Sequence, residues 1–119
     1  MYGLDMAIDL SFLIGREIIQ IAIGQFQIIF NFDESVSISV ESEFRLVSPD
    51  GDVSTWQPRV PEAAAVALRL LGLKVKNVSG QTNGTLTLTF SSGDILTILD
   101  SSKEYASYDI TCPGTTIVV

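Results

Sequence analysis

Leu13-Ile14-Gly15 opens one series of strand-like segments, and Leu70-Leu71-Gly72 opens a second series 57 residues further along the chain. The correspondence continues at offsets of 58, 60 and 61 residues, which relate Phe32 to Phe90, Ile38 to Ile98 and Phe44 to Tyr105. Extra residues in the turns of one copy would produce such a drift, although chance similarity between apolar strands is an alternative. The sequence therefore predicts one domain over residues 1–119 with two repeat-like halves, about 13–46 and 70–110.

Apolar and polar residues alternate along much of both halves. Val36–Leu46 and Gln25–Phe32 each place their apolar residues on one face, with Ile29 as the exception, so Phe26 is expected in the core. Such alternation is typical of antiparallel strands with one buried face. Further strand segments are expected in the ranges 17–23, 73–78, 85–90, 95–99, 105–111 and 115–119.

One helix is expected between the halves, at about 61–71. Pro61 suits the first helical position, Glu62 complements the positive end of the helix dipole, and Gly72 can adopt the left-handed conformation at the end. For residues 4–14, a helical turn capped by Asp9 and a strand both remain open. The fold class that follows is α+β, mainly antiparallel β: two pseudo-duplicated β-meanders, forming a sheet or a half-barrel, with one connecting helix.

Three short motifs follow one another in the order L-[IL]-G, G-x-[FY]-x-I and Y-x-S-Y-x-I, at residues 13–15, 24–28 and 105–110. With this pattern the chain resembles a family of small bacterial proteins of about 120 residues, which are rich in β-structure and uncharacterised. The family's marker has Glu between the first Tyr and the Ser, where this chain has Ala106. The resemblance implies a fold and a bacterial origin, but it implies no activity and no residue roles.

The residue types that most enzymes need are scarce. The chain has no His, which removes the commonest general base and metal ligand, and its single Cys112 has no imidazole partner. A glycine-rich phosphate loop is missing as well. The carboxylates of Asp50 and Asp52 are interpreted as a solvated turn. We therefore expect no enzyme, with no catalytic, metal-binding or cofactor-binding residue and no cofactor.

Charge and hydropathy limit the partners. Fourteen acidic residues against seven basic ones give a net charge of −7, which disfavours nucleic acid and anionic lipid surfaces. No apolar stretch approaches the roughly 20 residues that span a membrane. The single cysteine and the lack of a leader-like start favour the cytoplasm.

Four residues are candidates for partner contact. Trp56 and Arg59 fall in the stretch 49–61, which we expect to be a loop, and a tryptophan beside an arginine can anchor an interface. A lid that covers the sheet is the alternative role for Trp56. Glu41 and Glu43 lie on the polar face of a predicted strand and could form an acidic docking stripe.

The function we expect is therefore that of a small cytoplasmic bacterial protein that binds another protein, in its most specific version an immunity-like or antitoxin-like partner of a basic toxin. The alternative is a protein that binds a small apolar ligand; an enzyme based on carboxylates and tyrosines is the least favoured. Thr115–Val119 contains no charge and no proline, so it either pairs inside the sheet or forms an edge that attracts another chain. The partner is expected to be a protein or a second copy in a homodimer.

Overall fold

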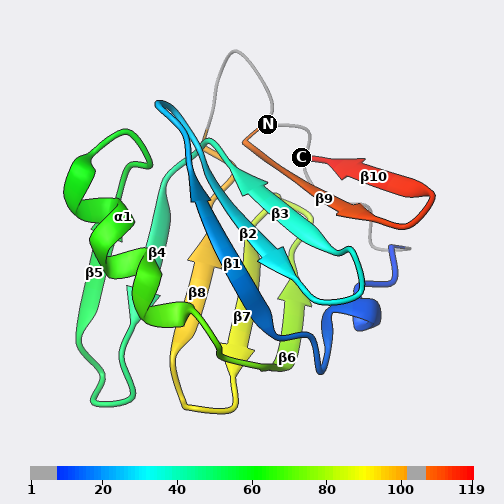
Figure 1. Ribbon diagram of the computed structural model, residues 1–119, viewed down its shortest axis with the longest axis horizontal. Coiled ribbons are helices and arrows are strands. Elements are labelled where there is room, and N and C mark those ends of the chain that lie inside the picture. The colour runs from blue at the N-terminus through cyan, green and yellow to red at the C-terminus, as the bar shows by residue number, and fades with distance from the viewer. Residues whose placement is uncertain (1–7, 102–106) are drawn as a thin grey trace.

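The computed structural model describes residues 8–101 and 107–119, which form two five-stranded antiparallel sheets (Figure 1). In chain order, with η for a 3-10 helix, the elements are η1 (Ser11–Leu13), β1 (Ile18–Ile23), β2 (Ile28–Phe32), β3 (Ser37–Val40), β4 (Phe44–Val47), β5 (Val53–Trp56), α1 (Pro61–Ala67), η2 (Leu68–Leu70), β6 (Val75–Gly80), β7 (Leu86–Phe90), β8 (Ile95–Ile98), β9 (Tyr108–Cys112) and β10 (Thr115–Val118). The expected fold class, mainly antiparallel β with a short helix, is confirmed.

The two halves of the chain exchange their last hairpins. The first sheet has the order β1-β2-β3-β9-β10, and the second has the order β5-β4-β8-β7-β6. Each sheet therefore consists of a three-stranded meander from one half and a hairpin from the other half. In each sheet the hairpin pairs with the meander of the other half: β9 pairs with β3, with Ile110 opposite Ile38, and β4 pairs with β8, with Leu46 opposite Leu96.

Matching main-chain details relate the two halves. Gly15 and Gly72 both have a φ of 85°, a left-handed conformation that favours glycine. The amide of Gly15 donates to the carbonyl of Val75 at 2.7 Å, and the amide of Gly72 donates to the carbonyl of Ile18 at 2.8 Å. The pairing of β1 and that of β6 each contain a register shift directly after Ile18 and Val75. The roughly duplicated arrangement expected from the repeat is therefore present.

The later part of the expected alignment needs correction. Ile38 faces Phe30 in its hairpin as Leu96 faces Leu88, so Leu96 and not Ile98 corresponds to Ile38. The wrong match arose because the apolar residues of a strand recur every two positions, and a shift by two leaves the pattern unchanged.

Tyr108, and not Tyr105, corresponds to Phe44, because each begins the exchanged hairpin of its half. The connection that precedes it covers residues 99–107 in the second half and only 41–43 in the first. Most of the additional residues therefore lie in this one connection rather than in several turns. Tyr105 itself lies outside the described residues.

The core lies between the two sheets. Its largest side chains come from both sheets and are at most 2% exposed: Phe30, Phe32, Phe44, Phe90 and Tyr108. Burial of each such side chain contributes roughly 1.5–3 kcal/mol.

Phe26 does not belong to this core, contrary to expectation, because its side chain is 63% exposed. The amide of Gly24 donates to the carbonyl of Gln27 at 2.9 Å and closes the turn between β1 and β2. The alternation of β2 therefore begins only at Ile28, and Phe26 lies in the turn.

The segment 36–46 is divided between β3 and β4, which belong to different sheets. The amides of Glu41 and Ser42 both donate to the carbonyl of Ser107, at 2.9 and 3.0 Å, and fix the bend between the strands. Ser42 is buried within the bend. The crossing thus preserves the sequence alternation while the chain changes sheets.

The helical segments lie at opposite sides of the molecule. α1 lies beside the edge strands β1 and β5, and η1 lies toward β6 (Figure 1). The expected helix at about 61–71 is α-helical only to Ala67 and then continues as η2. The described part of the open N-terminal segment contains a short helical turn, η1, but its N-cap is Leu10 and not Asp9 as expected. The carboxylate of Asp9 accepts from the amide of Ser11 at 2.9 Å. In the described residues, no helix is long and apolar enough to cross a membrane.

Candidate functional site

The β3–β4 connection and the connection from β5 to α1 both lie toward the upper end of the molecule in Figure 1. Glu41 and Glu43 belong to the β3–β4 connection, Trp56 is the last residue of β5, and Arg59 follows in the connection to α1. Glu41 and Arg59 are exposed, whereas Trp56 and Glu43 are half-buried. Two connections that are distinct in sequence therefore place these residues at a common end.

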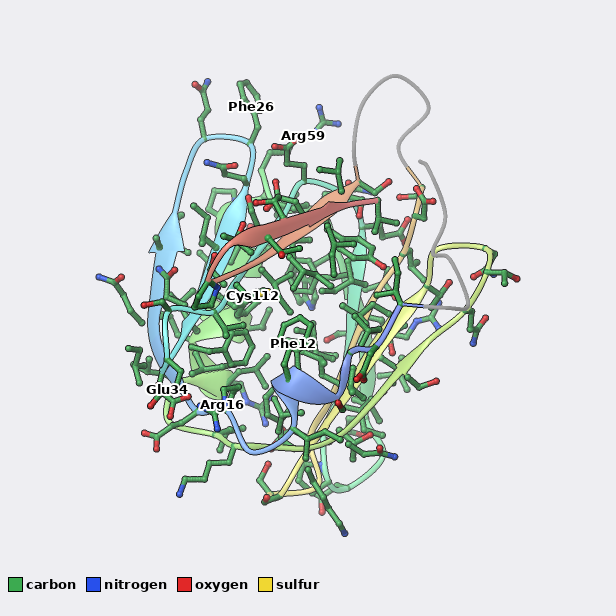
Figure 2. The ribbon with its side chains drawn as sticks, turned by 90° about the vertical axis from the view of Figure 1, so that its right-hand side faces the viewer. Phe12, Arg16, Phe26, Glu34, Arg59 and Cys112 are labelled. Carbon is green, nitrogen blue, oxygen red and sulfur yellow. The ribbon has the colours of Figure 1, made fainter. Side chains whose placement is uncertain are left out.

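Among the residues that the structure describes, Phe26 is the most exposed large apolar residue. Gln25, Phe26, Gln27 and Glu41 line a shallow hollow of about 410 Å³, which we call the turn surface. Figure 2 shows the Phe26 side chain directed outward at the same end as Arg59. The hydroxyl of Ser39 donates to the Gln27 side chain at 3.1 Å and fixes the base of the turn to β3. An exposed aromatic side chain is thus presented on an ordered turn.

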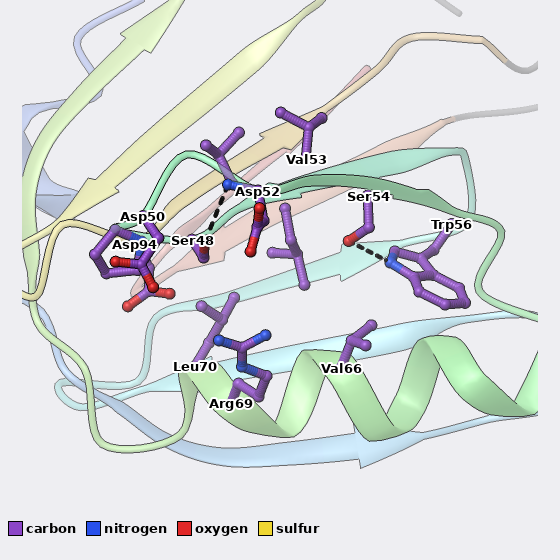
Figure 3. Close-up of a pocket in the computed structure, with 13 residues that line it drawn as sticks. Ser48, Asp50, Asp52, Val53, Ser54, Trp56, Val66, Arg69, Leu70 and Asp94 are labelled. Atoms are coloured by element: carbon purple, nitrogen blue, oxygen red, sulfur yellow. Dashed lines mark hydrogen bonds between the residues drawn. The ribbon is translucent and has the colours of Figure 1, made fainter.

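Trp56 lines a different feature, a groove of about 350 Å³ between the β4–β5 hairpin and the helical segment α1–η2. Its indole N–H donates to the hydroxyl of Ser54 at 2.8 Å, and Figure 3 shows its ring at one end of the groove. Asp50 and Asp94 lie at the opposite end, and Arg69 extends from the helical side. Trp56 lies in the edge strand β5 and not in the expected loop, and its side chain packs partly buried against the core, whereas its role in partner contact stays a prediction.

Two groups of β9 have a raised pKa. Burial, and then the nearby negative charge of Asp100, raise the pKa of the Tyr108 hydroxyl above its usual range. This hydroxyl donates to the main-chain carbonyl of Gly84 at 2.7 Å. Burial also raises the pKa of the Asp109 carboxyl. A phenol that stays protonated and donates to the main chain supports the structure and is poorly suited to proton transfer.

Nucleophilic and metal chemistry has little support in the described residues. No group of three or more His, Cys, Asp or Glu side chains there could hold a metal ion. Cys112 is half-buried at the end of β9 and shares a surface hollow with Phe12 and Val36. The chain has no His to activate this thiol.

Comparison with known proteins gives a family but no activity. Neither a curated protein nor a solved structure matches the chain. A family model described as a family of unknown function, DUF6188, matches residues 10–119. This agrees with the expected resemblance to a small uncharacterised family, whereas the bacterial origin remains a prediction. The chain belongs to the DUF6188 family.

Proposed function

We propose that this protein is a non-enzymatic protein-binding module that contacts its partner through the turn surface. The observation that carries the proposal is the 63% exposure of Phe26 on an ordered turn. Aromatic residues and arginine are enriched among the residues that dominate binding energy, and Arg59 lies at the same end. Aliphatic side chains such as Ile19 and Val53 are exposed as well, at 58% and 61%, but among the exposed large apolar residues that the structure describes Phe26 is the one aromatic.

The partner is expected to be basic. The chain carries a net charge of −7, and Glu41 lies in the turn surface itself. A positively charged partner would be attracted over a distance of about one Debye length, roughly 8–10 Å at physiological salt. An immunity-like or antitoxin-like protein in the cytoplasm, which neutralises a basic toxin, is the most specific form of this proposal. A small apolar ligand held between sheet and helix has less support, because the groove there is lined by the charged residues Asp50, Asp52, Asp94 and Arg69.

A photo-crosslinking amino acid at position 26 would identify the partner, and the purified partner would then be titrated with variants. We expect Phe26→Ser to weaken binding at least tenfold, equivalent to about 1.4 kcal/mol. Its free energy of unfolding should change by less than about 0.5 kcal/mol, because the side chain is exposed. Leu71→Ser is the matched control, since Leu71 is also an exposed apolar residue but lies outside the turn surface. Equal affinity of wild type and Phe26→Ser, or a strongly acidic partner, would contradict the proposal.

A second copy of the chain is the other candidate partner, through the edge strand β10. The main chain of Val119 exchanges hydrogen bonds with Tyr108, which by alternation directs the N–H and C=O groups of Thr116 and Val118 away from β9. Thr115–Val118 carries no charge, so two copies can pair here without opposing like charges. Light scattering should give a dimer mass for wild type and a monomer mass for Thr116→Pro, which removes an outward N–H. A monomeric wild type at high concentration would exclude the homodimer.

A further inference from the structure

β5 is an edge strand with unused main-chain groups. The amide of Ser48 donates to the carbonyl of Asp52 at 2.9 Å, and the register continues through the pairs Leu46–Ser54 and Phe44–Trp56. In an antiparallel ladder, hydrogen-bonded and non-hydrogen-bonded pairs alternate. The N–H and C=O groups of Val53 and Thr55 therefore point away from β4. In the described part of the chain, β5 pairs with no second strand.

The groove lies directly beside this edge. Ser54 and Trp56 line it from β5, and Val66, Arg69 and Leu70 line it from the helical side (Figure 3). Its volume of about 350 Å³ suits a few side chains, and the four residues of β5 span about 13 Å. An added strand of four or five residues would thus be able to pair with β5 and place alternate side chains toward the helix.

The charges of the groove indicate what such a strand would carry. Asp50, Asp52 and Asp94 line the groove, and Arg69 is the one basic residue among its lining residues. In the residues that the structure describes, Arg69 forms no ion pair with these carboxylates. The groove therefore has an excess of negative charge at one end, opposite the ring of Trp56, whose face also favours a cation.

We infer that the groove between β5 and α1 binds an extended segment of a partner protein, which adds to β5 as a further strand and places a Lys or Arg side chain beside Asp50, Asp52 and Asp94. Main-chain hydrogen bonds supply part of the affinity in this recognition mode, and pockets for alternate side chains supply selectivity. Charge complementarity selects a basic segment over a second copy of this chain, which carries −7. The groove is separate from the turn surface, so the two sites can be tested independently.

The test uses the full chain, labelled with ¹⁵N, and the probe peptide acetyl-Lys-Val-Thr-Val-Lys-amide, which carries a cation at either end because the strand direction is open. We expect the largest amide shifts at Val53–Trp56 and along α1. A peptide with Glu in place of both Lys residues should bind at least tenfold more weakly. A peptide of the same sequence with N-methylated central amides, which cannot donate to β5, should also bind at least tenfold more weakly.

The charge contribution is tested on the protein side. Exchange of Asp50, Asp52 and Asp94 for Asn should weaken binding of the Lys peptide about tenfold and reduce its salt dependence. Glu62→Gln is the matched control, because Glu62 is an exposed acidic residue of α1 that does not line the groove.

Four outcomes would overturn the inference: no binding of the Lys peptide, shifts centred on β10 or the turn surface, equal binding of the Lys and Glu peptides, or undiminished binding of the N-methylated peptide. Concentration-dependent shifts of β5 amides without peptide would identify a second copy as the occupant instead. Because the peptide controls need no change in the protein, they remain decisive even if the Asn variant is unstable. Loss of partner binding in Phe26→Ser with peptide binding retained would separate the two sites.

Discussion

The β6–β7 turn and the β1–β2 turn occupy equivalent places in the two halves, but only the first is held from the opposite sheet. The hydroxyl of Tyr108 donates to the carbonyl of Gly84 at 2.7 Å, and Gly84 is buried against Asp100. In the first half, Phe44 occupies the position of Tyr108. The second turn is one residue longer than the first, and counted back from β2 and β7 Phe26 corresponds to Gly84. Phe44 has no hydroxyl to donate, and Phe26 projects into solvent.

The comparison shows where the two similarly folded halves differ. β2 and β7 have the same alternation of buried and half-buried residues, so the core pattern is common to both. The turns that follow β1 and β6 differ in exposure and in side-chain size. They also differ in that only the turn after β6 accepts a hydrogen bond from Tyr108 of the opposite sheet. A turn on a rigid sheet can change in these ways at little cost to the fold, which is why binding residues are frequently found in such places.

The largest effect is expected for Gly84→Ala. Gly84 has a φ of +93°, and an added methyl group would overlap the Asp100 side chain. We expect a loss of about 3 kcal/mol or more in the free energy of unfolding, measured by urea denaturation. Gly51→Ala is the control, because Gly51 has a φ of +91° but open space around it, and should lose only about 1–2 kcal/mol. Equal losses of stability in Gly84→Ala and Gly51→Ala would mean that the close contact with Asp100 does not constrain the turn.

A smaller loss is expected for Tyr108→Phe, which gives the second half the residue type of Phe44. The change leaves the carbonyl of Gly84 without its donor and should cost about 1–2 kcal/mol in urea denaturation. Because the pKa of the Tyr108 hydroxyl lies above its usual range, the loss should be the same at about pH 6 and about pH 9. A variant as stable as wild type would show that the hydroxyl is not what holds this turn.

The smallest effect is expected for Asp109→Asn, at the position that corresponds to the exposed Arg45 of the first half. Burial raises the pKa of Asp109, so the native state binds a proton more tightly than the unfolded chain does, and stability falls as the pH rises through this range. The variant should therefore be slightly more stable than wild type at neutral pH.

In thermal denaturation, this gain should vanish below the unfolded pKa of 3.8, where the wild-type carboxyl is protonated in both states. Arg45→Gln is the control and should change stability by less than about 0.5 kcal/mol at either pH. A variant that is less stable at neutral pH would show that the carboxylate is favourably placed.

Most strands could be predicted because one buried face imposes a period of two on the sequence. The exchange of hairpins could not, since the buried alternation continues across the bend at Ser42 while the chain changes sheets. β5 was missed because its four residues, Val53–Trp56, lie between turn-forming segments. A short edge strand leaves little more than its β-branched residues as a signal.

The candidate site was predicted in part. Of the four residues expected to contact a partner, Glu41 belongs to the turn surface and Trp56 lines the groove, and their role in binding stays a prediction. The alternation predicts Phe26 in the core because it is two residues before Ile28, the first buried residue of β2, and so has the spacing of that face. The preceding Gly24 and the flanking glutamines were the available signals of a turn. The groove depends on the approach of β5 to α1, which no local pattern encodes.

The exchanged hairpins also determine the order in which the protein is completed during synthesis. β3 borders β9, so the first sheet cannot close until the ribosome has made a segment about 70 residues further along the chain. Until then, β3 presents an open edge, and such edges favour pairing with other chains. Pairing between distant segments also slows folding. Neither half can therefore form a complete sheet on its own. We expect the open edge of β3 to stay exposed on the nascent chain until the second half has been synthesised.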